Sequence, residues 1–409
     1  MRTLCLLLCF GCSNAPTGPT PMDSVTFTPT GCTYQVTNPG ETQLAIVDDG
    51  SLPGGAARAA HVAWMADPST SAMIVWESDP SVTASRLTFG PSGGAQSSAR
   101  GFSYAYATDL AGTDPPSVRV HQVHLCGLTP ATAYAYSIEG GPSGTFATAP
   151  ARGATMRFAV AGDSRGNAPE WGKLLAAAAM QGLDFLVYTG DAVDLGSIQS
   201  AWDDWLNASA SVFPTVPIVF AMGNHEASMR HWFAQFPQAG NSQWFDFDEG
   251  DLHFVVLNDS PRDMTTIAGD QAKFLDASLA GSDRKWKLVV HHRAVFSSSV
   301  HGSQADLQAA WMPIYDARGV DLVMNGHDHD YERSKTMKGG MPSASGTVYI
   351  VNGGGGADLY AAGMTPSTAF SQSTYAYSIV DATPAKLTVS AFSLMNGAPM
   401  QIDQVTLSK

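Results

Sequence analysis

Residues 321–329 read Asp-Leu-Val-Met-Asn-Gly-His-Asp-His, an apolar run of strand length that ends in metal-binding side chains. Four other segments also pass from apolar residues to Asp, Asn or His; they are residues 157–163, 185–191, 217–226 and 287–292. Such runs predict strands buried on both faces of an open sheet, and binding sites gather beyond the carboxyl ends of these strands. The five terminal groups are therefore expected to meet at one place. Their oxygen and nitrogen atoms, with no thiolate among them, suit Zn, Mn, Fe or Mg.

The composition is that of a globular chain with room for more than one domain. Of 409 residues, 44% are hydrophobic and 14% are charged, so we expect two or three domains with sizeable cores. The formal net charge is −14. An acidic surface disfavours the backbone of a nucleic acid or an anionic bilayer as the main partner. A small anionic substrate stays compatible with this charge, because bound cations dominate the local field of a metal site.

The first residues have the pattern of an export signal. Arg2 supplies a positive charge, and residues 4–10 form an apolar stretch that is too short to span a bilayer. The Gly-Cys-Ser-Asn run around Cys12 resembles a bacterial lipobox, in which Cys12 is lipidated, although Cys9 stands where Leu is usual. Residues 1–21 would then be a signal followed by a Pro-rich tether. We expect an exported protein held on a bacterial membrane by Cys12. The alternatives are ordinary secretion, to the periplasm or beyond, or neither.

Two of the five cysteines remain for the folded part of the chain. Cys5 and Cys9 lie in the signal and Cys12 is the lipid candidate, which leaves Cys32 and Cys126. Export favours a disulfide between these two, because exported proteins meet oxidising compartments. The alternative is a pair of buried free thiols.

Residues 22–150 have an all-β pattern. Residues 118–125 and 133–138 alternate between the two faces of a strand, and Pro, Gly and Ser clusters separate the strand-like runs at short spacing. The pattern predicts a small antiparallel sandwich. Residues 125–136, closed by residues 144–150, resemble a fibronectin type III module.

From residue 155 onward, strands alternate with helices, which predicts an α/β layered domain over residues 155–409. The expected helices cover residues 169–180, 198–210, 269–279 and 306–318. The chain ends in three β-like runs at residues 377–380, 386–392 and 401–407.

The order of the polar motifs resembles a known family. Gly-Asp, Gly-Asp, Gly-Asn-His-Glu, a strand-ending His and Gly-His-x-His follow one another as in the calcineurin-like metallophosphoesterases. Residues 326–333 are similar to the Gly-His-x-His-x-Tyr-Glu-Arg run of the purple acid phosphatase branch, and a type III-like module before the catalytic domain fits that branch. The resemblance implies an αββα catalytic domain with two metal ions, most often Fe, Zn or Mn.

The resemblance also implies a role for each motif residue. Asp191 would be the carboxylate that bridges the two metals, and His225 would lie beside the phosphate without binding metal. The remaining ligands would be Asp163 and His329 for the first metal and Asn224, His292 and His327 for the second.

Two positions depart from the purple phosphatase pattern. Asp194 stands where that branch has the Tyr that binds ferric iron; it could be a ligand, an acceptor for a ligand His, or a helix N-cap. Arg165 stands where other branches have a His. An Arg cannot bind a metal, so Arg165 is either a phosphate clamp or a residue at the surface or in a salt bridge. Asn167 is a further, weaker candidate for the first metal.

His291 and His292 compete for one ligand position. The family motif His-x-Pro-x-Tyr-x-Ser fits when it starts at His292, with Ala294 for Pro and Phe296 for Tyr. We therefore assign His292. His301 lies near the place where purple phosphatases have a substrate-contacting His, and the alternative for it is a solvent-exposed loop residue.

The expected function is hydrolysis of small phosphate monoesters. In the mechanism that the resemblance implies, a metal-bound hydroxide attacks phosphorus, Arg165 and His225 offset the charge, and His225 or His301 protonates the leaving oxygen. A phosphodiesterase with the same metals is the second interpretation. The third is a cell-surface binding protein whose phosphoesterase domain is inactive.

Overall fold

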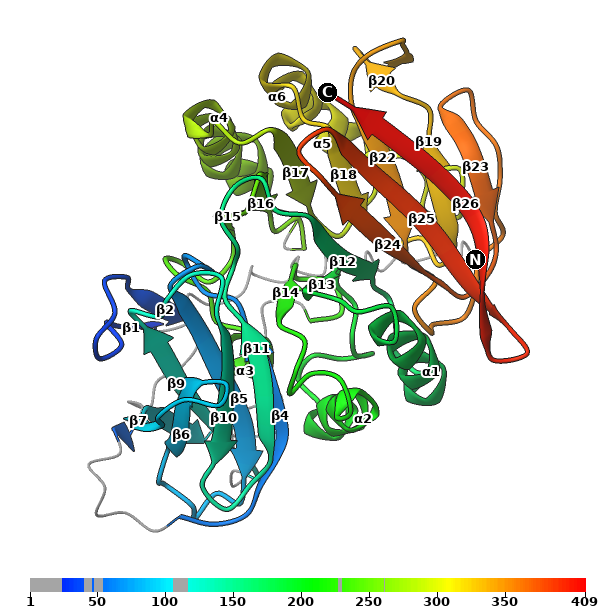
Figure 1. Ribbon diagram of the computed structural model, residues 1–409. Coiled ribbons are helices and arrows are strands. Elements are labelled where there is room, and N and C mark those ends of the chain that lie inside the picture. Colours follow the sequence, from blue (N-terminus) through cyan, green and yellow to red (C-terminus); the bar gives the residue numbers. More distant parts are fainter. Residues whose placement is uncertain (1–23, 40–45, 48–53, 106–116, 227–229, 261) are drawn as a thin grey trace, which may run out of the picture.

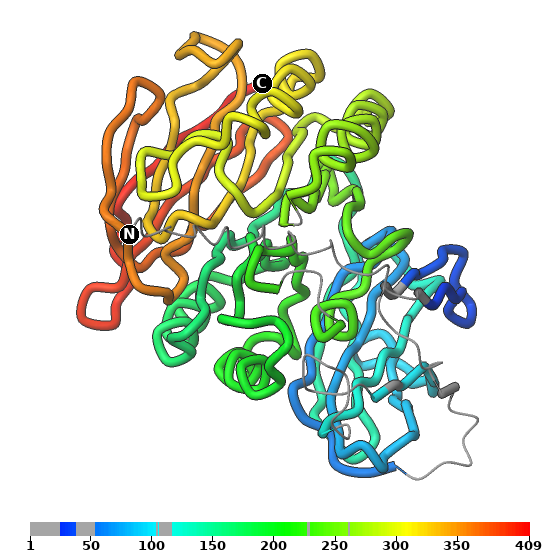
Figure 2. The backbone as a smooth tube through the Cα atoms, turned by 180° about the vertical axis from the view of Figure 1, so that it is seen from behind, coloured from blue at the N-terminus to red at the C-terminus, as the bar shows by residue number. Residues whose placement is uncertain are grey.

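The computed structural model describes residues 24–39, 46–47, 54–105, 117–226, 230–260 and 262–409. Cys12 and the expected signal and tether lie outside these ranges. Among the described residues, no helix has the length and apolarity that crossing a bilayer requires. Figure 1 shows an N-terminal β-sandwich beside a larger α/β part, and Figure 2 shows from behind that the sandwich and the C-terminal strands occupy opposite ends of the molecule.

The N-terminal part consists of two facing antiparallel layers. One sheet has the order β11-β10-β6-β7, with strands Ser143–Ala147, Ala133–Ile138, Arg86–Pro91 and Ser97–Arg100. The other layer has the order β4-β5-β9-β8-β3, with strands Ala57–Ala63, Ser71–Ser78, Arg119–Cys126, Phe102–Ala105 and Ile46–Val47. Trp64 and Phe146 meet between the layers with 6.4 Å between ring centroids. A hairpin precedes them, formed by β1 (Ser24–Phe27) and β2 (Val36–Pro39).

The α/β part contains two sheets packed face to face. The first has the order β26-β25-β24-β12-β13-β14, with strands Ala398–Ser408, Lys386–Met395, Ala376–Ala382, Met156–Ala161, Phe185–Tyr188 and Ile218–Phe220. The second has the order β15-β16-β17-β18-β22-β19-β23, with strands Phe245–Glu249, Leu252–Val256, Trp286–Val290, Leu322–Asn325, Val348–Asn352, Tyr331–Ser334 and Thr368–Gln372. A small ribbon, β20 (Met337–Lys338) and β21 (Met341–Pro342), completes the set.

Helices cover the outer faces, which gives the αββα layering. The first sheet carries α1 (Ala168–Ala179), α2 (Gln199–Ser209) and α3 (Arg230–Gln235). The second carries a π-helical turn η1 (Thr266–Gln271), α4 (Ala272–Gly281), α5 (Ala305–Ala310) and α6 (Met312–Arg318). Between the sheets, Phe158 and Phe185 stack at 4.8 Å, and both meet Phe254 of the opposite sheet edge-on. This aromatic core fixes how the two sheets face each other.

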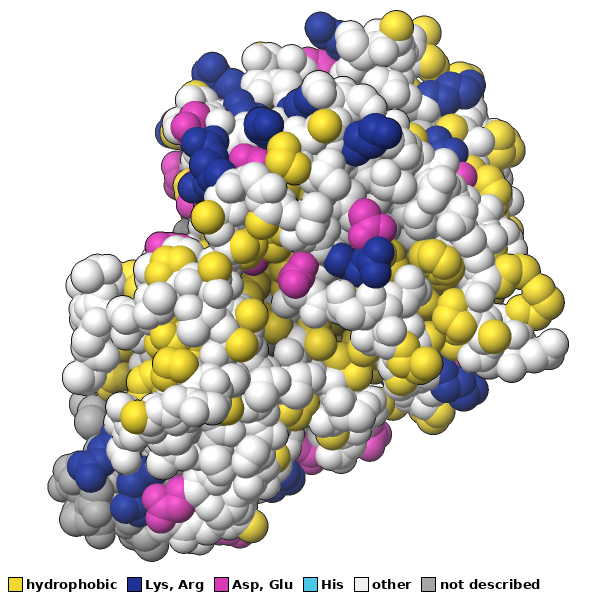
Figure 3. All heavy atoms as spheres, viewed as in Figure 1, with side chains coloured by type: hydrophobic (Ala, Val, Ile, Leu, Met, Phe, Trp, Pro, Cys, Tyr) yellow, Lys and Arg dark blue, Asp and Glu magenta, His cyan; other side chains and the backbone are white. Residues whose placement is uncertain are grey.

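The sandwich and the α/β part share one continuous sheet. β4 pairs in parallel with β14 through Ala63 and Ile218, so the order runs on from β14 into β4. Glu77 of β5 is fully buried at this junction and accepts hydrogen bonds from Gln199 of α2 and Gln235 of α3. On the face in Figure 3, apolar side chains gather along the seam between the two parts. The sandwich therefore supports the strand that leads to Asn224.

Cys32 and Cys126 form a disulfide, as expected from the count of cysteines. The bond ties the segment between β1 and β2 to the end of β9, across a sequence separation of 94 residues. Closing a loop of this length stabilises the fold by about 4–5 kcal/mol in the chain-entropy account.

Two of the four expected helices differ in detail from the sequence prediction. The helix expected over residues 306–318 is broken at Trp311 into α5 and α6. Pro313 explains the break, because it has no N–H to donate and its ring clashes with the preceding turn. The helix expected over residues 269–279 begins earlier, with the π-helical turn η1.

Candidate metal centre

The five strand-ending motifs do meet at one place, but two sheets rather than one bring them together. Strands β12, β13 and β14 are parallel in the first sheet, and β17 and β18 are parallel in the second. Asp163 accepts the backbone N–H of His327 across the two sheets at 3.0 Å. The sequence argument from a single open sheet was therefore wrong about the sheet and right about the convergence.

Of the four residues expected around the second metal, three place a polar atom close to Nε2 of the fourth, His292. Nε2 of His292 is 3.0 Å from Oδ1 of Asn224 and 3.2 Å from Oδ2 of Asp191. Nδ1 of His327 is 3.2 Å from the same Nε2. One donor atom each from Asp191, His292 and His327 lies within 4.8 Å of the others. Nitrogen and oxygen atoms that share such a small volume could hold a metal ion.

Backbone carbonyls orient two of the imidazoles. Nδ1 of His292 lies 2.8 Å from the carbonyl oxygen of Thr189, and Nδ1 of His329 lies 2.8 Å from that of Asp358. A carbonyl oxygen can only accept, so Nδ1 carries the proton in both rings. Nε2 of each neutral ring then presents its lone pair to the site, as a metal ligand must.

Asp163 and His329 are the pair expected at the first metal. Nε2 of His329 lies 3.7 Å from Oδ1 of Asp163, and both side chains are buried. Burial raises the pKa of the Asp163 carboxyl well above its usual range. An ionised carboxylate at this place therefore calls for a cation close by.

Three of the candidate ligands adopt a strained backbone. Asp163, Asp191 and His327 have φ angles of 57°, 59° and 72°, which non-glycine residues rarely adopt. Such strain persists only where the surrounding structure holds it, and it clusters at functional sites. The turn after each strand thereby aims the side chain back over the strand ends.

The glycines of the motifs leave room for the carboxylates. A Cβ on Gly223, just before Asn224, would lie 2.2 Å from Oδ1 of Asp191. A Cβ on Gly326, just before His327, would lie 2.2 Å from Oδ2 of Asp163. The Gly in Gly-Asn-His is thus required by close approach to a carboxylate that follows the neighbouring strand, and the Gly in Gly-His-x-His by close approach to a carboxylate of the facing sheet.

The donor chemistry, the imidazole orientations and the buried carboxylates fit a pair of hard or borderline metal ions. Asp163 and His329 would hold one ion, Asn224, His292 and His327 the other, and Asp191 lies between the two groups. The ligand roles themselves stay a prediction.

The surroundings of the two rings distinguish His292 from His291. Nδ1 of His291 lies 3.0 Å from Oδ2 of the buried Asp259, and the side chain of Asn325 lies beside the same ring. The His291 ring therefore faces away from the donor cluster, whereas His292 lies within it. Asp259 also accepts the backbone N–H of Arg293 at 2.8 Å, so this pair anchors the turn after β17.

Arg165 lies at the edge of the donor cluster and is held there by Asp194. Nη1 of Arg165 donates to Oδ1 of Asp194 at 3.0 Å, and Nε lies 4.0 Å from Oδ2 of Asp191. Nε is buried and has no hydrogen-bond partner among the described residues. The guanidinium thus keeps one donor without a hydrogen bond beside the carboxylate of Asp191.

The structure corrects the readings of Asp194 and Asn167. Oδ1 of Asp194 accepts from Arg165, no bond from a candidate ligand His to this carboxylate is seen among the described residues, and the N-cap position of α2 belongs to Ile198; a ligand role for Asp194 stays a prediction. Asn167 caps the N-terminus of α1, where its side chain accepts the N–H of Glu170, which replaces the proposed ligand role.

Two further imidazoles border the cluster. The backbone N–H of His225 donates to Oδ1 of Asp191 at 2.9 Å, and its Nδ1 lies 2.6 Å from the carbonyl oxygen of Asp194. Nε2 of His225 is 3.8 Å from Oδ2 of Asp191. The His301 ring stacks on that of His327, with 4.1 Å between the centroids. His225 and His301 therefore lie beside the cluster rather than inside it.

Sequence reasoning missed the role of Glu226. This residue is fully buried, and its carboxylate accepts the backbone N–H groups of Asp191, Ala192 and Gly223 at 2.7–2.9 Å. Burial, first of all, raises its pKa to about 7. Its place directly after Asn224 and His225 was the signal that could have marked it as the residue that fixes the turns carrying Asp191 and Asn224.

Tyr360 is the second residue that the sequence did not reveal. Its ring stacks on that of His329, with centroids 4.0 Å apart, and its backbone N–H donates to the His329 carbonyl. The Gly-rich loop at residues 353–356 brings it there, because Gly355 binds the carbonyl of Gly162 beneath the cluster. No pattern in the sequence marks a single Tyr in such a loop.

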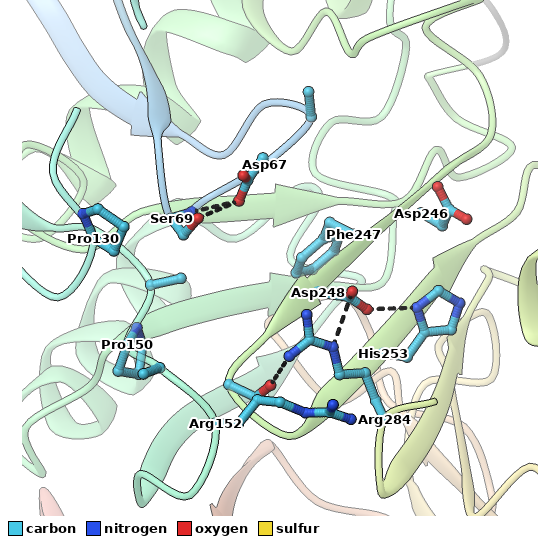
Figure 4. Close-up of a pocket in the computed structure, with 14 residues that line it drawn as sticks. Asp67, Ser69, Pro130, Pro150, Arg152, Asp246, Phe247, Asp248, His253 and Arg284 are labelled. Atoms are coloured by element: carbon cyan, nitrogen blue, oxygen red, sulfur yellow. Dashed lines mark hydrogen bonds and ion pairs between the residues drawn. The ribbon is translucent and has the colours of Figure 1, made fainter. Parts of the chain in front are cut away.

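A separate pocket of about 620 Å³ lies between the sandwich and the β15–β16 hairpin. Figure 4 shows that its charged side chains bind one another: Asp248 lies between His253 and Arg284. Arg152 pairs with Asp283 nearby. Nε of Arg284 lies 3.0 Å from Asp248 in this pocket, whereas Nε of Arg165 lies 4.0 Å from Asp191.

Two sequence profiles match the chain. That of the calcineurin-like phosphoesterases matches residues 156–331, and that of the purple acid phosphatase N-terminal domain matches residues 58–154. The chain therefore contains a calcineurin-like metallophosphoesterase domain preceded by a purple acid phosphatase N-terminal domain, which confirms the resemblance of the motifs to the purple acid phosphatase-like branch. The fibronectin type III resemblance stays a prediction.

Among curated proteins, the chain is 28% identical over 311 residues to an uncharacterised protein of Mycobacterium tuberculosis, covering 58% of each chain. It is 28% identical over 265 residues to purple acid phosphatase 18 of Arabidopsis thaliana, covering 59% of each. The chain thus spans less than two thirds of the length of these relatives.

Among solved structures, the purple acid phosphatase PPD1 of yellow lupin seeds superposes with a TM-score of 0.77 and 19% identity. The match covers 87% of this chain and 74% of that one. A structure of PhoD gives a TM-score of 0.61 at 14% identity, over 85% and 90% of the two chains. At these identities the matches support the fold alone.

Proposed function

We propose that the protein is a dimetal phosphoesterase that hydrolyses small phosphate monoesters. The observation that supports this most is the cluster of Asp191, His292 and His327, whose donor atoms lie within 4.8 Å of one another, with Arg165 beside it. Two cations held there would polarise the phosphoryl oxygens and activate a water. Fe, Zn and Mn are the metals that this donor set and family favour.

The residues of the chain have separate tasks in this reaction. Arg165, whose side chain is 22% exposed, binds a phosphoryl oxygen through its guanidinium, and Asp194 keeps that group in place. A water oxygen bonds to phosphorus as the bond from phosphorus to the ester oxygen breaks, and the water gives up a proton. The ester oxygen takes a proton from an imidazolium. His225 suits this task, because its Nδ1–H is engaged by the Asp194 carbonyl and Nε2 can release the proton.

Metal analysis combined with turnover of two substrates tests the proposal. We expect about two metal ions per chain, and faster turnover of an activated aryl phosphate than of the matching aryl phosphodiester. Preference for the diester would make the protein a phosphodiesterase with the same metals. Binding of metal without turnover of either substrate would favour a surface binding protein.

The same proposal includes attachment to a membrane surface through Cys12. Lipidation at this residue would supply more than one acyl chain, which holds a protein far more firmly than a single chain does. Replacing Cys12 by Ser should move the protein from the membrane to the soluble fraction or block its processing. Unchanged membrane association of the variant would contradict the anchor.

A further inference from the structure

His301 lies on a loop that is held by buried side chains. It is exposed and belongs to the loop of residues 297–301, where a side chain would ordinarily have much freedom. Its ring nevertheless lies on that of His327, with 21° between the ring planes. The loop must therefore be fixed by contacts of its other residues.

Two buried carboxylates make these contacts. Oδ1 of Asp328 accepts the backbone N–H of His301 at 2.8 Å, and Oδ2 accepts the hydroxyl of Ser297 at 2.5 Å. Both oxygens of Glu332 lie 2.9 Å from the backbone N–H of Ser298, and Oε2 accepts the Ser298 hydroxyl at 2.8 Å. Asp328 is fully buried and Glu332 is 4% exposed.

The same short segment carries the candidate metal ligands. Along residues 327–332, His327 and His329 turn toward the donor cluster, whereas Asp328 and Glu332 turn toward the 297–301 loop. This division arises in a run of bends after β18, in which His327 has a φ of 72° and Asp328 and Asp330 each donate a backbone N–H to the carbonyl two residues before. The position of His301 is thereby tied to that of His327 through very few bonds.

The chemistry makes this link stiff. Hydrogen bonds from backbone N–H groups to carboxylates are shorter and about twice as strong as bonds between neutral groups. If the loop moved away, two buried carboxylates would lose their donors, which costs more than breaking a bond at the surface. The loop is thus fixed although its outer residues are exposed.

We propose that Asp328 and Glu332 are positioning residues that hold His301 over His327, where His301 assists protonation of the leaving oxygen. This inference rests on the proposed phosphoester hydrolysis. Neither carboxylate touches the reacting atoms; each acts through the loop.

The first test compares rates on an alkyl phosphate and on an activated aryl phosphate, since only the alkyl leaving group depends strongly on a proton donor. Glu332→Gln and Asp328→Ala should lose about 10-fold more rate on the alkyl phosphate than on the aryl phosphate. Both oxygens of Glu332 accept from Ser298, so the amide of Glu332→Gln places an NH2 group against one of these donors. Asp328→Asn should lose less than Asp328→Ala, because its amide oxygen can still accept the His301 N–H. In a His301→Ala background, Glu332→Gln should add little further loss, since both changes remove one interaction.

Asp321→Asn is the matched control. Asp321 lies at the opposite end of β18, where it accepts the N–H of Lys287 and the ammonium of Lys409. This variant should lower stability without changing the ratio of the two rates. Equal loss on both substrates in Glu332→Gln, or loss of metal from it, would overturn the proposal.

Amide hydrogen exchange supplies a readout that does not depend on activity. The N–H groups of Ser298 and His301 should exchange slowly in the wild type despite the exposed loop, and faster in Glu332→Gln and Asp328→Ala respectively. Fast exchange of both groups in the wild type would refute the positioning role. Wild-type protein that turned over neither substrate would instead refute the proposed hydrolysis. The exchange rates would then still show whether Asp328 and Glu332 hold the loop in place.

Discussion

Asp191→Asn is expected to lower phosphatase activity by about 100-fold or more. Asn keeps the size of the side chain and loses the negative charge that two cations would share. Asp191 lies within 4 Å of His292, His225 and Arg165, so its charge also organises the groups around it. Metal content and turnover of an aryl phosphate, measured on the same preparation, check this result. We expect fewer than two metal ions per chain in the variant.

Asp184→Asn is the matched control for this change. Asp184 precedes β13, as Asp191 follows it, and accepts the backbone N–H of Arg157 at 2.7 Å. The control should keep its metals and its activity. An Asp191→Asn protein with wild-type metal content and rate would show that the cluster is not the catalytic centre.

His225→Ala should keep both metals and lose activity in a way that depends on the leaving group. Proton donation is worth roughly 10²–10⁴-fold, and an activated aryl leaving group needs it least. The variant should therefore lose more rate on an alkyl phosphate than on an aryl phosphate. Steady-state rates on the two substrates, with metal analysis of each protein, measure this.

His253→Ala controls for the loss of an imidazole. His253 binds Asp248 and Ser278 beside the separate pocket, away from the donor cluster. Its substitution should leave the ratio of the two rates unchanged. Loss of metal from His225→Ala would make His225 a ligand, and equal loss on both substrates would make it a phosphate-binding group without an acid role.

The parts of the site that depend on local pattern were predictable from the sequence. An apolar run that ends in Gly-Asp or Gly-His specifies a buried strand, a tight turn and a polar side chain at its carboxyl end. Asp163, Asp191 and His327 all follow this rule, and the choice of His292 over His291 followed from motif register. The helix break before Pro313 was also predictable from local sequence. The prediction of one continuous helix there was wrong because it gave this proline too little weight.

The parts that depend on distant contacts were not predictable. The residue pattern alone did not show that the strands divide between two sheets, which only the family resemblance implied, and nothing in the sequence marked the pairing of β4 with β14. Glu226 and Tyr360 act through backbone N–H groups and ring stacking, which no spacing rule encodes. Asp194 was ambiguous because its partner Arg165 lies on another strand end.

A crystal structure of the metal-loaded protein, with anomalous scattering recorded at the metal edge, tests the central claim most directly. We expect two peaks, one bordered by Asp163 and His329 and the other by Asn224, His292 and His327, with Asp191 between them. A single peak, or peaks away from the carboxyl ends of β12, β13, β17 and β18, would contradict the dimetal centre.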